Sequence, residues 1–144
     1  MLIKVITVGK IKDKNILAKI NEFVKRIQFD AKIELLELKD STKEKEGAKL
    51  LDILNKEKGF VFAMSEEGKQ MTSRQFGDKM SATHQKMIFV IGGPFGLTEE
   101  VKKKANVTFS LSKMTFTHEM AKMFLLEQIF RGISIIKGRG YHND

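Results

Sequence analysis

The sequence of 144 residues contains no cysteine and only one proline, Pro94. The absence of cysteine excludes disulfides, thiolate metal sites and a cysteine nucleophile. The three histidines, His84, His118 and His142, are far apart in the sequence and do not have the spacing of metal ligands. We therefore expect no metal site.

Long hydrophobic runs are also missing. No stretch approaches the roughly 18 apolar residues that cross a bilayer, and no basic segment followed by an apolar leader is present. Together with the absence of cysteine, which fits a reducing compartment, this predicts a cytoplasmic protein with no membrane partner.

Positive charge is in excess. The formal net charge is +8 and the calculated isoelectric point is about 9.6, which makes a polyanion a natural partner, although lysines can also serve solubility alone. The lysines are spread along the chain, so any nucleic-acid contact is expected to come from a folded surface. With 42% hydrophobic and 31% charged residues, we expect a single globular domain over residues 1–144.

Short apolar runs alternate with segments of helical periodicity. The runs predict strands over residues 2–8, 33–38, 60–64, 87–91 and 107–111. The periodic segments predict helices over residues 15–27, 46–54, 72–83 and 117–136, with another starting at Thr98. We expect capping boxes at Ser41 with Glu44 and at Thr72 with Gln75, and a polar turn over residues 65–69. This alternation predicts an α/β fold, a mainly parallel sheet with helices on both faces.

A glycine-rich loop, GGPFG, follows the apolar strand that ends at Ile91. Ligands of parallel sheets bind beyond the carboxyl ends of the strands, so this loop, Met64 and residues 111–116 are expected to meet at one edge. A ligand at this edge would be bound by backbone N–H and C=O groups, because glycines allow the main chain to approach it closely. The loop has neither the P-loop lysine nor the G-x-G-x-x-G pattern, which disfavours nucleotide triphosphate hydrolysis. The alternative is an ordinary turn.

The last predicted helix is apolar around most of its circumference. Such a helix is buried on more than one side. It is either a central core helix or a helix with one side on the sheet and the other on a second subunit of a twofold dimer.

Several polar residues near this helix are candidates for chemistry. His118 opens the helix, where a structural role is the alternative, and Glu127 with Arg131 has the spacing of an ordinary helix ion pair. The tail over residues 137–144 contains Arg139, Tyr141 and His142 between glycines. It is either a frayed end or a segment suited to RNA, with a stacking ring and cations.

Five motifs together resemble one family. They are VGK at residues 8–10, IGGPFGL at 91–97, LSKMTFTHEM at 111–120, EQIFR at 127–131 and YHND at 141–144. The combination is similar to the RlmH family of SPOUT-class RNA methyltransferases, and it extends over essentially the whole chain. The resemblance implies a SPOUT-type α/β knot with a C-terminal trefoil, which departs from the usual unknotted chain. It also implies a homodimer with its active site at the subunit interface, and S-adenosyl-L-methionine as cofactor.

The implied reaction is methylation of N3 of a pseudouridine in 23S rRNA of the large subunit, within the assembled ribosome. Carried over by motif, the cofactor-binding positions are Met64, Gly92, Leu111, Ser112, Lys113, Met114, Thr115 and Phe116. The candidate catalytic residues on the substrate side are His118, Arg131, Tyr141 and His142. Of these, Tyr141 and His142 are the candidates to accept the N3 proton.

Two residues depart from the family pattern. Thr117 stands where proline is expected, and Lys122 stands where arginine is expected, which would loosen phosphate or base recognition there. Two other functions remain open from the sequence, namely a ribosome- or RNA-binding module without turnover and a flavodoxin-like nucleotide-binding protein. We also expect a bulky residue at Gly92 to abolish cofactor binding while the fold is retained.

Overall fold

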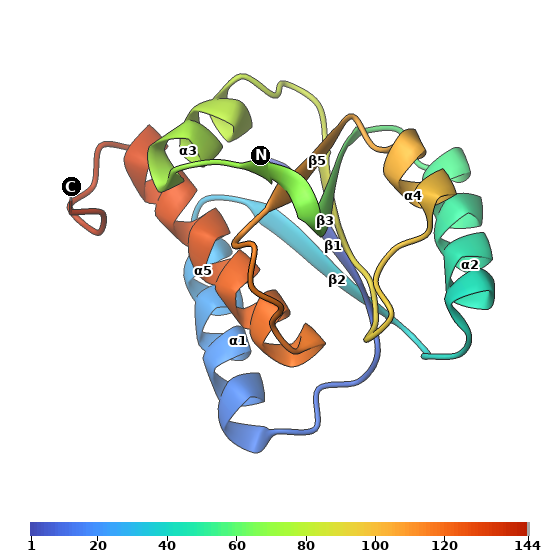
Figure 1. Cartoon of the computed structure of the whole chain (residues 1–144). Coiled ribbons are helices and arrows are strands. Elements are labelled where there is room, and N and C mark those ends of the chain that lie inside the picture. The colour runs from blue at the N-terminus through green and yellow to red at the C-terminus, as the bar shows by residue number, and fades with distance from the viewer. Residues whose placement is uncertain (144) are drawn as a thin grey trace.

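Five parallel strands form one sheet in the order β2-β1-β4-β3-β5 in the computed structural model, which describes residues 1–143 (Figure 1). The strands are β1 (Leu2–Val8), β2 (Lys32–Leu38), β3 (Phe60–Gln70), β4 (Met87–Ile91) and β5 (Val107–Ser110). The helices are α1 (Lys14–Ile27), α2 (Lys43–Lys56), α3 (Ser73–Ser81), α4 (Glu99–Lys104) and α5 (His118–Ile136).

Helices cover both faces of the sheet. α1, α3 and α5 pack on one face, and α2 and α4 pack on the other (Figure 1). β4 contributes apolar side chains to both faces. Met87 and Phe89 belong to the core under α1, α3 and α5, whereas Ile88 and Val90 belong to the core under α2 and α4. Side chains of a strand alternate between faces, so an uninterrupted apolar run indicates a strand buried on both sides. The predicted α/β fold with a covered parallel sheet is confirmed.

β3 is longer than the sequence predicted. The polar turn expected over residues 65–69 is wrong, because the strand continues to Gln70 after a register shift between Met64 and Lys69. Lys69 then pairs with Phe109. Gly68 permits this approach, since a β-carbon there would come within 2.5 Å of the Phe109 carbonyl carbon. The irregular stretch carries Ser65 and Glu66 to the carboxyl edge of the sheet.

Hydroxyl side chains cap most helices. The capping box of Thr72 and Gln75 is confirmed, and Thr98 caps α4 by accepting from the Val101 N–H. The capping box expected at Ser41 is wrong. The cap of α2 is Thr42, which accepts from the Lys45 N–H, and the Ser41 N–H donates instead to the Glu46 carboxylate.

α5 occupies the centre of one layer. It lies between α1 and α3 and against the sheet, and its fully buried residues include Leu125, Ile129 and Ile133. Phe130, on the side facing α1, lies 6.3 Å from Phe23 between ring centroids. These contacts account for an apolar surface around most of the helix. The large apolar side chain of the helix that is exposed is Met120, in the first turn.

Candidate functional site

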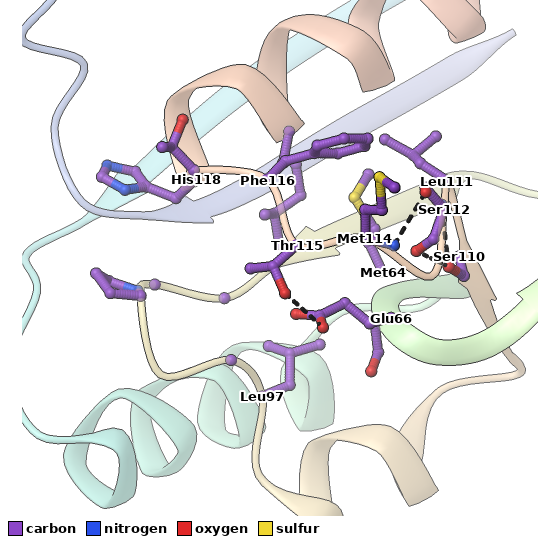
Figure 2. A pocket seen from close by; sticks show the side chains of 18 residues that line it. Met64, Glu66, Leu97, Ser110, Leu111, Ser112, Met114, Thr115, Phe116 and His118 are labelled. Carbon is purple, nitrogen blue, oxygen red and sulfur yellow. Dashed lines mark hydrogen bonds between the residues drawn. The ribbon is translucent and has the colours of Figure 1, made fainter.

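Two bends of the main chain border one cavity at the carboxyl edge of the sheet (Figure 2). The first bend, residues 92–97, follows β4, and the second, residues 111–116, follows β5. The cavity has a volume of about 460 Å³, which is within the usual range of small-molecule sites. Its apolar lining residues are Met64, Ile91, Pro94, Leu97, Leu111, Met114, Phe116 and Ala121. The sequence therefore identified correctly which two bends come together.

The glycine bend is held by its own backbone. The Gly96 N–H donates to the Gly93 carbonyl at 2.9 Å, and Gly96 has a φ of +78°, a conformation that favours glycine. At Gly92 an added β-carbon would lie 2.7 Å from the Gly96 carbonyl carbon. Glycine is thus required at position 92 for closure of the bend. The expectation that a bulky residue there would spare the fold is not supported, because it collides with the bend itself.

The second bend is fixed by serine hydroxyls. The Ser110 hydroxyl donates to the Ser112 carbonyl at 2.7 Å and accepts from the Ser112 N–H at 3.1 Å. The Ser112 hydroxyl accepts from the Met114 N–H at 3.0 Å. These local hydrogen bonds satisfy polar backbone groups of a segment that forms no backbone hydrogen bonds with a neighbouring strand among the described residues. All the predicted cofactor positions line the cavity except Lys113.

Glu66 is a lining residue that the sequence analysis missed. Its carboxylate accepts a hydrogen bond of 2.8 Å from the Thr115 hydroxyl, and Figure 2 shows the two side chains pointing toward each other across the cavity wall. Of the lining residues within the described range 1–143, Glu66 and His118 have ionisable side chains. No sequence signal indicated Glu66, because it lies in the stretch interpreted as a turn.

His118 borders the cavity at the start of α5. Thr117 caps this helix by accepting from the Met120 N–H at 3.3 Å. The φ of Thr117 is −61°, an angle that proline also adopts, so the departure from the family pattern keeps the backbone conformation. The Nε2 atom of His118 is buried and has no hydrogen-bond partner among the described residues.

The other three candidate catalytic residues form a separate cluster. Arg131 donates to Glu127 at 2.5 and 3.1 Å and contacts His142 Nδ1 at 3.1 Å. A guanidinium can only donate, so Nδ1 is the acceptor in this contact. The Tyr141 hydroxyl donates to Glu127 at 3.2 Å, and the Arg131 guanidinium lies 4.7 Å from the ring centroid. Burial, followed by the Glu127 carboxylate, raises the pKa of Tyr141.

The C-terminal tail is held in place. Arg139 forms two hydrogen bonds of 2.7 Å with the Asp30 carboxylate, and the Tyr141 ring packs edge-on against Phe130 at 4.8 Å. Of the two alternatives for the tail, these contacts contradict a frayed end for residues 139–142. Asp144, the last residue of the closing motif, lies outside the described residues.

His118 and Arg131 lie at different places on α5, and Tyr141 and His142 belong to the tail that follows this helix. At about 1.5 Å per residue, His118 and Arg131 are roughly 20 Å apart along the helix axis. A second cavity of about 270 Å³ separates them, since it shares Leu111 and Phe116 with the first cavity and reaches Glu127. One chain therefore brings His118 to the first cavity, whereas Arg131, Tyr141 and His142 are grouped around Glu127, which lines the second.

Lys122 is a core residue. Its exposed fraction is 3%, and its Nζ lies 3.0 Å from the Glu37 carboxylate of β2. The suggestion that it recognises phosphate or a base is not supported, because the ammonium is turned inward and paired.

Two absences concern the described part of the chain. Among residues 1–143, no three histidine, aspartate or glutamate side chains are grouped so that they could hold a metal ion. Within the same range no helix has the length and apolar character needed to cross a membrane.

Comparisons with known proteins agree with this architecture. A family model described as "Predicted SPOUT methyltransferase" matches residues 1–142. Proteins named "Ribosomal RNA large subunit methyltransferase H" from Bacillus cytotoxicus and Acholeplasma laidlawii are 40% identical, and the one from Enterococcus faecalis is 35% identical. Each alignment covers 99% of this chain and 99% of the relative.

Two solved structures share the fold at low identity. A probable methylase family protein from Haemophilus influenzae superposes with a TM-score of 0.58 at 13% identity, covering 99% of this chain and 70% of that one. The tRNA (m1G37) methyltransferase from Aquifex aeolicus superposes with a TM-score of 0.56 at 15% identity, covering 91% of this chain and 70% of that one. At these identities the likeness concerns the fold alone. The family model and the full-length relatives show that this chain belongs to the SPOUT methyltransferases, in the ribosomal RNA large subunit methyltransferase H family.

Proposed function

We propose that this protein methylates a base of large-subunit ribosomal RNA with S-adenosyl-L-methionine as methyl donor. The proposed target is N3 of a pseudouridine in 23S rRNA within the assembled ribosome. The observation that carries the proposal is the meeting of the bends 92–97 and 111–116 on one cavity. The net charge of +8 supports an RNA partner. The full-length relatives are named as enzymes, so a binding module without turnover is not favoured.

The cavity fits the proposed cofactor. Met64, Leu111, Met114 and Phe116 offer apolar and sulfur surface for an adenine ring and a methionine chain, and the fixed backbone of both bends offers polar groups. Met64, Gly92 and residues 111–116 are the proposed contacts, with Lys113 contributing through its backbone. When bound, S-adenosyl-L-methionine supplies a sulfonium methyl group that is electrophilic. The role of the chain is to hold the accepting base in line.

The N3 proton of the target base must leave during the reaction. The raised pKa of Tyr141 keeps its phenol protonated and donating to Glu127, which makes the phenol a poor proton acceptor. We therefore assign Tyr141 and Arg131 to positioning. His142 remains our candidate acceptor, by way of Nδ1 once its contact with Arg131 is released, because a neutral ring that accepts at Nδ1 carries its proton on Nε2. His118 is our candidate for contact with substrate or cofactor, because it borders the cavity.

A homodimer is part of the proposal. Arg131, Tyr141 and His142 are remote from the first cavity of their own chain. In a twofold dimer with the active site at the interface, this cluster from one subunit would complete the cavity of the other. The exposed apolar side chains of Met114, Phe116 and Met120 support such an interface. We also propose that residues 1–144 act as one domain with a C-terminal trefoil knot, in the cytoplasm.

Isotope transfer tests the proposed reaction. The protein is incubated with S-adenosyl-L-methionine carrying a labelled methyl group and with either 70S ribosomes or free 23S rRNA that lacks the modification. Digestion and mass spectrometry then locate the label. Label on N3 of one pseudouridine is expected, with ribosomes as the better substrate. Label on another base would correct the proposed target, and no label on either substrate would contradict the proposed activity.

A further inference from the structure

Among the described residues that line the first cavity, Glu66 is the one carboxylate. It comes two residues after Met64, where β3 leaves its first register with β4 and β5. Its side chain is exposed to solvent on one side and faces Thr115 on the other (Figure 2). The carboxylate thus lies at the mouth of the cavity and is directed toward the second bend.

Most other side-chain oxygens of the lining are already occupied. The Ser110 hydroxyl both donates and accepts within the bend, and the Ser112 hydroxyl accepts from the Met114 N–H. An ionised carboxylate has about four acceptor sites and no donor. The Thr115 hydroxyl uses one of these sites. Glu66 therefore keeps acceptor capacity for hydrogen-bond donors of a ligand.

We propose that Glu66 accepts hydrogen bonds from the ribose hydroxyls of the methyl donor and thereby contributes to its affinity. This inference rests on the proposed function. The two adjacent hydroxyls of a ribose are neutral donors whose spacing suits one carboxylate. Acidic side chains beyond the carboxyl end of a parallel strand bind ribose in the same way in dinucleotide folds, which is an analogy of chemistry and placement.

Thr115 has a positioning role in this arrangement. The bond of 2.8 Å between its hydroxyl and Glu66 Oε2 restricts the carboxylate before the ligand arrives. A flexible glutamate would lose rotamer freedom on binding, so this restraint lowers the entropic cost. The same bond links the irregular part of β3 to the second bend and keeps both walls of the cavity together.

Isothermal titration with three ligands tests the inference, using Glu66→Gln in the full-length protein. The ligands are S-adenosyl-L-methionine, S-adenosyl-L-homocysteine and 5′-methylthioadenosine, which share the ribose but differ in sulfonium charge and in the amino-acid group. A contact to the ribose predicts that all three lose affinity by a similar factor, about tenfold. The 2′-deoxy form of methylthioadenosine should bind the wild type about as weakly as methylthioadenosine binds the variant.

Glu67→Gln is the matched control. Glu67 is the neighbouring exposed carboxylate, pairs with Lys102 at 3.2 Å and does not line the cavity. The affinities of the Glu67→Gln variant for the three ligands should equal those of the wild type. Thr115→Val, which removes the restraining hydroxyl and keeps the shape, should weaken all three ligands by a smaller common factor.

Other patterns would overturn the inference. Weakening of S-adenosyl-L-methionine alone would indicate an effect of the sulfonium charge. Weaker binding of S-adenosyl-L-methionine and S-adenosyl-L-homocysteine, with unchanged binding of methylthioadenosine, would indicate that Glu66 contacts the ammonium group of the amino acid. Unchanged affinities of Glu66→Gln would remove Glu66 from the site and leave the proposed function standing. If the wild type bound none of the three ligands, the proposed function itself would fail.

Discussion

The imidazole of His118 lies against Gly9, so closely that a β-carbon added at Gly9 would be 3.0 Å from Nε2. Gly9 follows β1 with a φ of +96°, and its N–H donates to the Leu38 carbonyl at 2.9 Å. The loop that follows is fixed to the same place, because the Glu119 carboxylate accepts from the Lys12 and Asp13 N–H groups at 3.1 and 3.0 Å. The first loop of the chain therefore positions the first residue of α5.

Gly9→Ala is expected to disturb His118. The positive φ strains any residue with a β-carbon, and the contact with Nε2 forces the imidazole to move, at a cost of about 1–3 kcal/mol in the free energy of unfolding. The rate of the proposed methyl transfer should fall as well. Urea unfolding measures the first effect. Gly140→Ala, whose β-carbon would meet no atom within 4 Å, should stay within about 0.5 kcal/mol of the wild type. Equal stability of both variants would contradict the role of Gly9.

Glu37→Gln is expected to destabilise the protein more than Lys122→Met. Loss of the Glu37 charge leaves the buried Lys122 ammonium without a charged partner, at a cost of about 1–3 kcal/mol. In Lys122→Met the remaining carboxylate is 42% exposed and can be hydrated, so the cost is smaller. Neither change should alter the salt dependence of RNA binding, measured well below the melting temperature. A shallower salt slope for Lys122→Met would show that this lysine does contact phosphate.

Stability in acid should depend on Glu57. Its carboxylate pairs with the buried Lys4 and, at 2.8 Å, with Lys86. Burial alone would raise the pKa of Glu57, but the hydrogen bonds and charges of the two lysines lower the pKa below the ordinary value of a glutamate. The stabilisation is therefore complete above the unfolded pKa and is lost as the pH falls through the lower folded value.

Glu57→Gln tests this dependence. At pH 7 the variant should be less stable by about 1–3 kcal/mol, because Lys4 stays buried with weaker partners. The difference from the wild type should shrink as the pH is lowered below about 4.5, since protonation removes the same charge from the wild-type carboxyl. Denaturant unfolding at several pH values measures it. A difference that did not change with pH would contradict the assignment.

Tyr141→Phe should retain most of the proposed methyl transfer. If Tyr141 were the proton acceptor, its loss would cost about 10²–10⁴-fold in rate. We expect the rate to fall by no more than about fivefold, which corresponds to the free energy of one hydrogen bond, because the phenol only donates to Glu127. Single-turnover transfer to ribosomes measures the rate. Glu127→Gln should cost more, because Glu127 receives bonds from both Arg131 and Tyr141. A decrease of a hundredfold or more in Tyr141→Phe would restore Tyr141 as acceptor.

Features encoded locally could be predicted from the sequence. β4 is an apolar run closed by glycines, and the capping box of Thr72 and Gln75 spans three residues, so both were predicted correctly. The cavity followed from a general rule, because parallel strands bring the loops after β4 and β5 to one edge. The motifs then identified the family, which periodicity alone could not have done.

Features that depend on distant partners were missed. Residues 65–69 look like a turn, and they become strand because Lys69 pairs with Phe109, a neighbour remote in the sequence. Arg139 fixes the tail through Asp30, which lies 109 residues away. The sequence around Lys122 suggests a surface cation, but in the structure this side chain is buried and paired with Glu37. In each case the decisive interaction is tertiary and leaves no local pattern.

Gly92→Ala should damage the first bend and the cavity together. The added β-carbon would lie 2.7 Å from the Gly96 carbonyl carbon and 2.8 Å from its oxygen, and backbone atoms cannot move aside as a flexible side chain can. We expect a loss of about 1–3 kcal/mol in stability and a loss of at least about tenfold in affinity for S-adenosyl-L-methionine, equivalent to 1.4 kcal/mol. Calorimetry and urea unfolding of the same samples measure both.

Phe95→Ala is the control for this bend. Phe95 lies in the same bend but is 68% exposed and does not line the cavity, so both affinity and stability should stay near the wild type. If Gly92→Ala lost affinity while keeping full stability, glycine at position 92 would serve the ligand instead of the bend. If it lost neither, the bend could not be the wall of the binding site, and the assignment of the cavity to the methyl donor would fail with it.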